Sequence, residues 1–137
     1  MQQIISFQVF DKTFGLLILE IQEIIRIKKV TPLPNVPEYV RGVLNLRGNI
    51  IPIIDMRRRL NFPSIEYNEF TRIIITNQNE HLAGLIIDKI NEVITVDKDK
   101  IKTNFTNYRG VSQEVLNGIV EDKKNLILLL NLKKLID

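Results

Sequence analysis

The sequence predicts a mainly β protein built from two similar small barrels that pack together, with short helices. Its 137 residues are 45% hydrophobic and 26% charged, which is enough chain for a substantial core. Short apolar runs bounded by glycine, proline, asparagine and aspartate recur along the chain and indicate strands. About five short strands in each half would leave hydrophobic edges in an open sheet, so we expect each half to close into a barrel.

An internal repeat divides the chain. Residues 15–25 align without gaps on residues 84–94, and the glycine, most apolar positions and one glutamate coincide. The repeat predicts a first half of about residues 1–70 and a second half of about residues 71–137, within a single domain. An exchange of strands between the halves is left open.

A second part of the repeat contains two helix starts. Residues 51–58 align on residues 127–134, and in both segments an apolar strand leads to a basic helical turn. Asp55 and Asn131 stand between strand and turn, where short polar side chains accept hydrogen bonds from helix-terminal N–H groups. We therefore predict that both residues are N-caps.

The first half is predicted to be mostly strands. The expected strand segments are 4–10, 13–19, 43–46 and 50–54. Residues 20–27 fit neither period cleanly, and we expect a helical turn that passes into a strand. The prolines of residues 32–37 predict a stiff, extended loop. Pro52 cannot donate a ladder hydrogen bond, so we expect its strand at a sheet edge or at a bulge.

The second half repeats this character. The expected strand segments are 72–76, 81–88, 90–96, 115–120 and 126–130. Residues 132–136 then form the closing helical segment behind Asn131.

The turn between the strands 43–46 and 50–54 is the strongest candidate for a binding site. Arg47 lies beside a glycine turn, where an always-charged side chain with five donors is well placed to bind carboxylates or carbonyl groups of a partner. The alternative is an internal salt bridge, for which Glu23 is the expected partner, and both roles can coexist. Gly42 and Gly48 would permit close approach of a partner, but such glycines more often supply a positive φ.

Composition argues against several classes of site. The chain has no Cys and a single His, which excludes disulfides and a cysteine nucleophile and makes a zinc centre improbable. His81 has no nucleophile or paired carboxylate nearby, so we expect an ordinary edge position. We expect no enzymatic activity, no cofactor and no metal. A signal peptide and an apolar run of ~18 residues are not visible, which predicts a cytoplasmic protein.

Charge leaves a competing function class open. A net charge of +3 and the run Arg57 to Arg59 suggest a small β-barrel that binds nucleic acid. Aromatic residues are only 7% of the chain, Trp is absent, and the aromatic side chains are not interleaved with the basic run, as base stacking would require. Consecutive residues of a helical turn point in different directions, so a solvated face is favoured for the three arginines.

Several motifs together resemble the CheW family of bacterial chemotaxis adaptors. The matching residues are Pro37, Tyr39, Val40, Gly42, Asn45, Leu46, Arg47 and Gly48, with the segments 51–55 and 84–88. The resemblance covers nearly the whole chain and implies two SH3-like five-stranded barrels without catalytic activity. It implies an adaptor that couples transmembrane chemoreceptors to the histidine kinase CheA in membrane-associated arrays. Asn131 stands where many relatives have Asp, which a cap tolerates.

The resemblance also implies binding residues. In the family, a groove between the barrels receives the cytoplasmic tip of the receptor, whereas apolar residues in strands are otherwise mostly core. The receptor-binding residues implied here are Ile21, Glu23, Gly42, Asn45, Arg47, Gly48, Ile90 and Val93. The other expected partner is the regulatory domain of CheA, whose contact residues are not assigned. Neither nucleic acid binding nor membrane insertion is expected. An adaptor of another receptor-like pathway and a barrel for small molecules stay open as alternatives.

Overall fold

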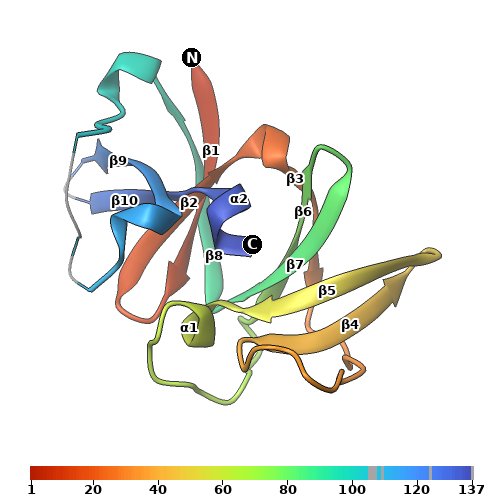
Figure 1. The fold of residues 1–137 in the computed structure, drawn as a ribbon. Coiled ribbons are helices and arrows are strands. Elements are labelled where there is room, and N and C mark those ends of the chain that lie inside the picture. Colours follow the sequence, from red (N-terminus) through yellow and green to blue (C-terminus); the bar gives the residue numbers. More distant parts are fainter. Residues whose placement is uncertain (105–107, 109, 124, 137) are drawn as a thin grey trace.

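The protein folds into two five-stranded β-sheets with a few short helices (Figure 1). The structure, a computed structural model, describes residues 1–104, 108, 110–123 and 125–136. The strands are β1 (Gln2–Val9), β2 (Lys12–Leu17), β3 (Ile21–Arg26), β4 (Val40–Leu46), β5 (Asn49–Asp55), β6 (Arg72–Gln78), β7 (His81–Ile87), β8 (Lys89–Val96), β9 (Leu116–Asp122) and β10 (Asn125–Leu130). The helices are α1 (Met56–Arg59) and α2 (Leu132–Ile136), with 3-10 turns η1 (Ile18–Glu20), η2 (Lys98–Lys100) and η3 (Gln113–Val115). The mainly β prediction is confirmed.

The two sheets interleave in the sequence. The first sheet has the strand order β8-β1-β2-β10-β9, and the second has β3-β6-β7-β5-β4. Residues 21–87 therefore supply all strands of the second sheet, and the flanking segments supply the first. The two sheets therefore do not correspond to a first and a second half of the chain divided near residue 70. The chain crosses from the first sheet to the second between β2 and β3, and it crosses back between β7 and β8.

The internal repeat is visible in the strand order. Each strand of the first sheet corresponds to the strand five places further along the chain, when the count continues from β10 to β1. Replacing every strand in this way gives the strand order of the second sheet. Gly15 of β2 pairs with Leu129 of β10, and Gly84 of β7 pairs with Ile53 of β5, both in parallel. A Cβ atom on Gly15 would lie 2.7 Å from Ile4 Cγ2, and one on Gly84 only 2.5 Å from Ile53 Cδ1. A side chain at either of the two repeated glycines would therefore force the isoleucine side chains packed on the central strands to move.

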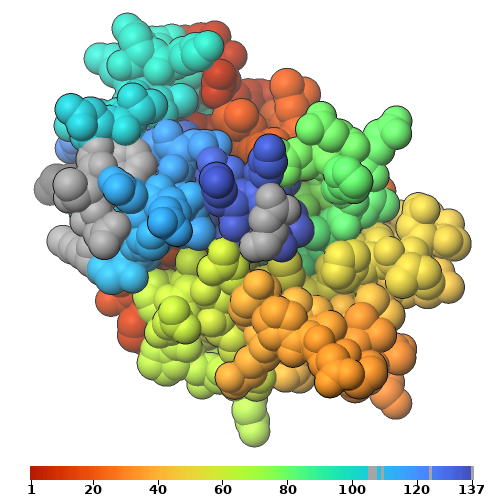
Figure 2. Space-filling view, viewed as in Figure 1, coloured from red at the N-terminus to blue at the C-terminus, as the bar shows by residue number. Residues whose placement is uncertain are grey.

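In the part of the chain that the structure describes, three apolar clusters form the core. One fills the second sheet and contains Leu44, Leu46, Ile51, Ile53, Ile73, Ile75 and Ile86. Another fills the first sheet and contains Ile4, Ile94, Val120, Ile127 and Leu129. The largest, called the central cluster here, takes residues from both sheets and both helices. Leu132 and Leu135 of α2 belong to it. Figure 2 shows the C-terminal segment, in dark blue, near the middle of the molecule.

The prediction for Pro52 is wrong. Its strand, β5, lies between β4 and β7 and is not an edge strand. The register of β5 with β4 runs through Pro52 without a shift, since the irregularity lies between Val40 and Gly42. Pairing of β5 with β7 begins only at Ile53, so the missing N–H of Pro52 falls outside that parallel ladder.

Both predicted N-caps are confirmed. The Asp55 carboxylate ends β5 and accepts a hydrogen bond from the Arg58 backbone N–H at 3.3 Å. The Asn131 side-chain oxygen accepts one from the Lys134 N–H at 3.1 Å. The helical turn expected before a strand is also present, as η1 followed by β3. No helix within the described ranges has the length and apolar character needed to cross a membrane.

Candidate functional site

The turn between β4 and β5 is displayed at the surface. Leu46 pairs with Asn49, and the two central residues have positive φ, +52° for Arg47 and +85° for Gly48. Two such residues form the turn whose twist matches a β-hairpin. The Asn45 side-chain oxygen accepts a hydrogen bond from the Gly48 N–H at 3.2 Å, and a side chain at Gly48 would face open space. The turn is therefore fixed internally while its outer side stays open.

Arg47 forms the internal salt bridge that the sequence allowed. Its Nη1 donates to Glu23 Oε1 at 2.5 Å. This hydrogen bond lowers the pKa of Glu23 and raises the pKa of Arg47. The Arg47 side chain is 67% exposed and that of Glu23 25% exposed, so several of the five guanidinium N–H donors remain accessible to a partner.

The ion pair also shows how the second sheet closes. Glu23 lies on β3, one edge of the sheet, and Arg47 follows β4, the opposite edge. A bond between them requires that the sheet curls until its edges approach each other. The candidate site therefore lies at the closure of the barrel, where two edge strands meet.

A bulge in β3 places Glu23. The register with β6 shifts between Ile21, which pairs with Thr76, and Glu23. The same shift occurs in the first sheet, where Ile90 of β8 pairs with Phe7 and Glu92 follows the irregularity. The repeat thus places Ile21 and Ile90 at equivalent positions, one on each sheet.

The apolar residues of the predicted groove differ in burial. Ile21 and Ile90 are half-buried and pack against the central cluster, which contains side chains from both sheets. Val93 lies on β8 and is 53% exposed. Ile21 and Ile90 therefore lie at the margin of the junction between the sheets, and Val93 adds an exposed apolar side chain on the same strand as Ile90.

Gly42 has a packing role. It is buried in β4 with φ +139°, and a Cβ atom there would lie 2.0 Å from the backbone oxygen of Thr31. The Thr31 N–H donates to the Val43 carbonyl at 2.9 Å, which holds the loop 27–39 over β4. Of the predicted site residues, the structure brings together Glu23, Asn45, Arg47 and Gly48, whereas Gly42 supports the strand behind them.

An ion pair that the sequence did not predict lies between the sheets. Arg57 Nη2 donates to Asp88 Oδ2 at 2.6 Å, and Arg57 Nε donates to Asp88 Oδ1 at 3.0 Å. The Phe10 N–H of the β1–β2 turn donates to the same carboxylate at 2.8 Å. Asp88 lies at the crossing from β7 to β8, so this cluster ties the two sheets together. Its signal in the sequence is that Asp88 aligns with the apolar Leu19.

The prediction that the three consecutive arginines form a solvated face is therefore wrong for Arg57, whose side chain is 13% exposed. Arg59 Nε donates to the Leu135 carbonyl at 2.8 Å, and Arg58 Nη1 lies 3.6 Å from a Glu38 carboxylate oxygen. The side chains do diverge, because consecutive helical residues point in different directions. With Arg57 and Arg59 held internally, the run forms no continuous basic surface for nucleic acid.

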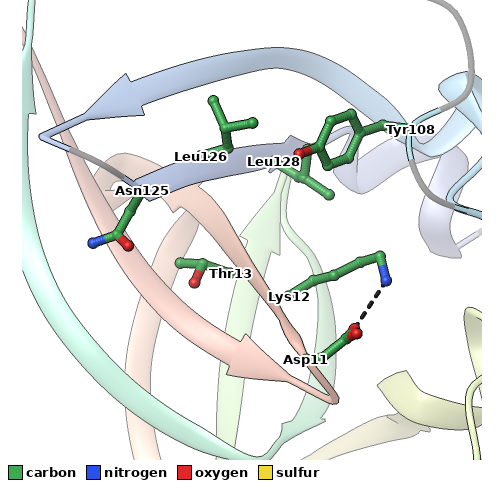
Figure 3. A pocket seen from close by; sticks show the side chains of 7 residues that line it. All are labelled: Asp11, Lys12, Thr13, Tyr108, Asn125, Leu126 and Leu128. Atoms are coloured by element: carbon green, nitrogen blue, oxygen red, sulfur yellow. Dashed lines mark hydrogen bonds and ion pairs between the residues drawn. The ribbon is translucent and has the colours of Figure 1, made fainter.

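A hollow of about 240 Å³ lies beside β2 and β10 (Figure 3). Lys12 Nζ lies 2.9 Å from Asp11 Oδ1, so these two charges neutralise each other. The other lining residues are Thr13, Tyr108, Asn125, Leu126 and Leu128.

His81 is exposed at the start of β7. This strand lies in the interior of the second sheet, so His81 does not have the edge position expected. Among the described residues, no group of three or more His, Cys, Asp or Glu side chains could hold a metal ion.

Comparisons with known proteins agree with this architecture. A family model described as the CheW-like domain matches residues 3–137. The chain is 32% identical over 136 residues to the chemotaxis protein CheW of Bacillus subtilis, covering 99% of this chain and 87% of the relative. It is 30% identical to CheW of Treponema pallidum, covering 97% of this chain and 81% of that protein. The crystal structure of the scaffolding protein TtCheW from Thermoanaerobacter tengcongensis superposes with a TM-score of 0.92 at 29% identity, covering 99% of this chain and 88% of that one.

Proposed function

Because the chain belongs to the CheW-like domain family, we propose that it is a non-catalytic chemotaxis adaptor that couples chemoreceptors to the histidine kinase CheA. The observation that carries this proposal is the family match over residues 3–137 together with the double-sheet fold shared with a scaffolding protein. Such a protein acts through binding surfaces and needs no reactive centre. Its place is in the cytoplasm, at membrane-associated receptor arrays.

The receptor-binding surface of this proposal is the β4–β5 turn with the neighbouring β3. Arg47, Gly48 and Asn45 are fixed by the turn, and Glu23 orients the guanidinium. An exposed Arg that is already held in one orientation loses little side-chain entropy when it binds a carboxylate or carbonyl of the receptor. Ile21, Ile90 and Val93 supply apolar contacts along the junction of the sheets.

The kinase regulatory domain binds a different surface in this proposal. Two barrels offer separate ends and edges, and the receptor site uses only the junction and one hairpin. Both partners can then be held at once, and weak contacts at each surface add up when many copies are linked in an array.

A matched pair of variants tests the receptor site. Arg47→Ala should weaken binding of a receptor-tip fragment by about 10- to 100-fold, because a hydrogen bond to a charged group contributes roughly 1.5–3 kcal/mol. Lys123 provides the control, since it occupies the equivalent turn of the first sheet, is exposed, and has a similar φ of +57°. Lys123→Ala should leave the receptor affinity unchanged. Isothermal titration with both variants decides the matter, and equal affinities for well-folded Arg47→Ala and wild type would remove Arg47 from the site.

A competition experiment tests the two-surface arrangement. Receptor fragment should fail to displace the CheA regulatory domain from the immobilised adaptor, and Arg47→Ala should lose receptor while it retains kinase. Mutual exclusion of the two ligands would contradict separate surfaces. Failure of both ligands to bind would contradict the adaptor function itself.

A further inference from the structure

A pocket opens where the parallel strands β2 and β10 of the first sheet both end. It has a volume of about 320 Å³, at the lower end of the range for small-molecule sites. Leu17 of β2, Leu129 and Leu130 of β10, and Ile101 of the link between β8 and β9 give it a mainly apolar wall. It lies outside the receptor site described above and is called the barrel-end pocket here.

Glu20 presents a carboxylate to this pocket. Its Oε1 accepts a hydrogen bond from the Leu17 N–H at 3.1 Å, which fixes the side chain against the end of β2. Burial raises the pKa of Glu20, and the backbone hydrogen bond only partly offsets this effect. Within the described ranges, Glu20 forms no ion pair, although Lys98 also lines the pocket. The carboxylate is therefore half-desolvated, and among the described residues no cationic nitrogen lies within ion-pair distance of it.

The repeat shows that this carboxylate is particular to the first sheet. In the aligned second segment, Lys89 stands at the position of Glu20, while Ile86 matches Leu17. The apolar residue at the position of Leu17 is thus repeated, but the acidic group is not. An unpaired carboxylate beside an apolar wall selects a ligand with a positive head and an aliphatic body.

We propose that the barrel-end pocket binds a small free primary alkylamine. The aliphatic chain lies against Leu17, Ile101 and Leu129, and the ammonium group pairs with Glu20. A carboxylic acid would place a like charge beside Glu20, and a neutral alcohol would leave the carboxylate without a counter-charge. A lysine side chain has the same chemistry, but it brings a peptide backbone to the mouth of the pocket.

The test is an NMR titration of the full chain with n-pentylamine, monitored at backbone amides that line the pocket. n-Pentanol and pentanoate are the matched ligands without positive charge, and a lysine capped at both ends tests the peptide source. Glu20→Gln keeps an acceptor for the Leu17 N–H and should weaken pentylamine binding at least about tenfold. Glu80→Gln, at the exposed β6–β7 turn, is the control. Asn117→Trp fills the pocket from its exposed rim and should abolish binding while Glu20 remains.

Saturable shifts with pentylamine that weaken in Glu20→Gln and vanish in Asn117→Trp support the proposal. Equal binding of pentanol, or unchanged affinity in folded Glu20→Gln, would overturn it, as would the absence of shifts at the pocket. Tighter binding of capped lysine than of pentylamine would replace the free amine by a protein side chain and also overturn it. Receptor and kinase binding do not enter this test, so its failure would leave the adaptor function untouched.

Discussion

The segments that follow β5 and β10 have the same order of elements but different polar contacts. In both, a strand ends at a capping residue and a short helix follows. At the first, Asp55 is 6% exposed and also accepts a hydrogen bond from the Tyr67 hydroxyl at 2.8 Å, while Arg57 is bound to Asp88. At the second, Asn131 stands in the position of Asp55 and exposed Lys133 in that of Arg57.

This difference separates what the repeat must keep from what it is free to change. Apolar alternation and the close-packed glycines maintain two similar sheets, because a barrel interior tolerates few changes of volume. Polar side chains at the ends of the sheets are not constrained in that way. They have diverged, so that one segment ties the sheets together and the other presents charge to solvent.

The largest expected effect compares two glycines under the connecting loops. Gly42→Ala should cost more than about 4 kcal/mol, because its Cβ would meet the Thr31 carbonyl oxygen at 2.0 Å and its φ is +139°. At the equivalent Gly118, whose φ is not in the positive region, an added Cβ would lie 2.6 Å from Ile101 Cγ2 and 3.0 Å from the Lys102 backbone oxygen. Gly118→Ala should therefore cost clearly less. Urea unfolding of both variants measures the difference, and equal losses would show that the two loops restrain their strands equally.

The ion pair between the sheets gives the next effect. Arg57→Ala should destabilise the fold by about 3 kcal/mol, because it leaves the mostly buried Asp88 carboxylate without its cation. Lys133→Ala, the equivalent change on α2, should stay within about 0.5 kcal/mol of wild type. A double-mutant cycle with Asp88→Ala checks the assignment: the double variant should lose little more than either single one, and full additivity would mean that the two side chains do not stabilise each other.

The two caps differ in the number of hydrogen bonds they accept. Asp55→Ala should cost about 2 kcal/mol, since the Arg58 N–H and the Tyr67 hydroxyl both lose their acceptor. Asn131→Ala should cost about 1 kcal/mol, because among the described residues only the Lys134 N–H loses its side-chain acceptor. Thermal unfolding at one pH compares them directly. A larger loss at Asn131 would reverse the proposed ranking of the two helix starts.

These contrasts also mark the limits of sequence-based prediction. The repeat, the strand segments and both caps could be predicted, because they depend on local periodicity and on short-range hydrogen bonds. The interleaving of the sheets could not, since pairing of β8 with β1 joins segments that lie far apart in the sequence. For the same reason, the Arg57–Asp88 contact was missed and the Arg47–Glu23 contact was predicted only as an alternative. The binding roles of the eight proposed receptor-site residues stay predictions.

The smallest effect concerns Tyr67, which has no counterpart at Asn131 among the hydrogen bonds described. Burial, and then the hydrogen bond to Asp55, raise the pKa of Tyr67 to about 12. The tyrosine hydroxyl has a pKa of about 10 in the unfolded protein, so the folded state favours the neutral side chain over the ionised one. This contribution is fully present below about pH 10 and is lost as the pH rises through 12. Tyr67→Phe should therefore cost about 1 kcal/mol at neutral pH and reduce the fall in stability between about pH 10 and 12. Chemical unfolding at several alkaline pH values measures both effects, and an identical pH dependence in wild type and variant would show that the phenol does not contribute to holding the cap.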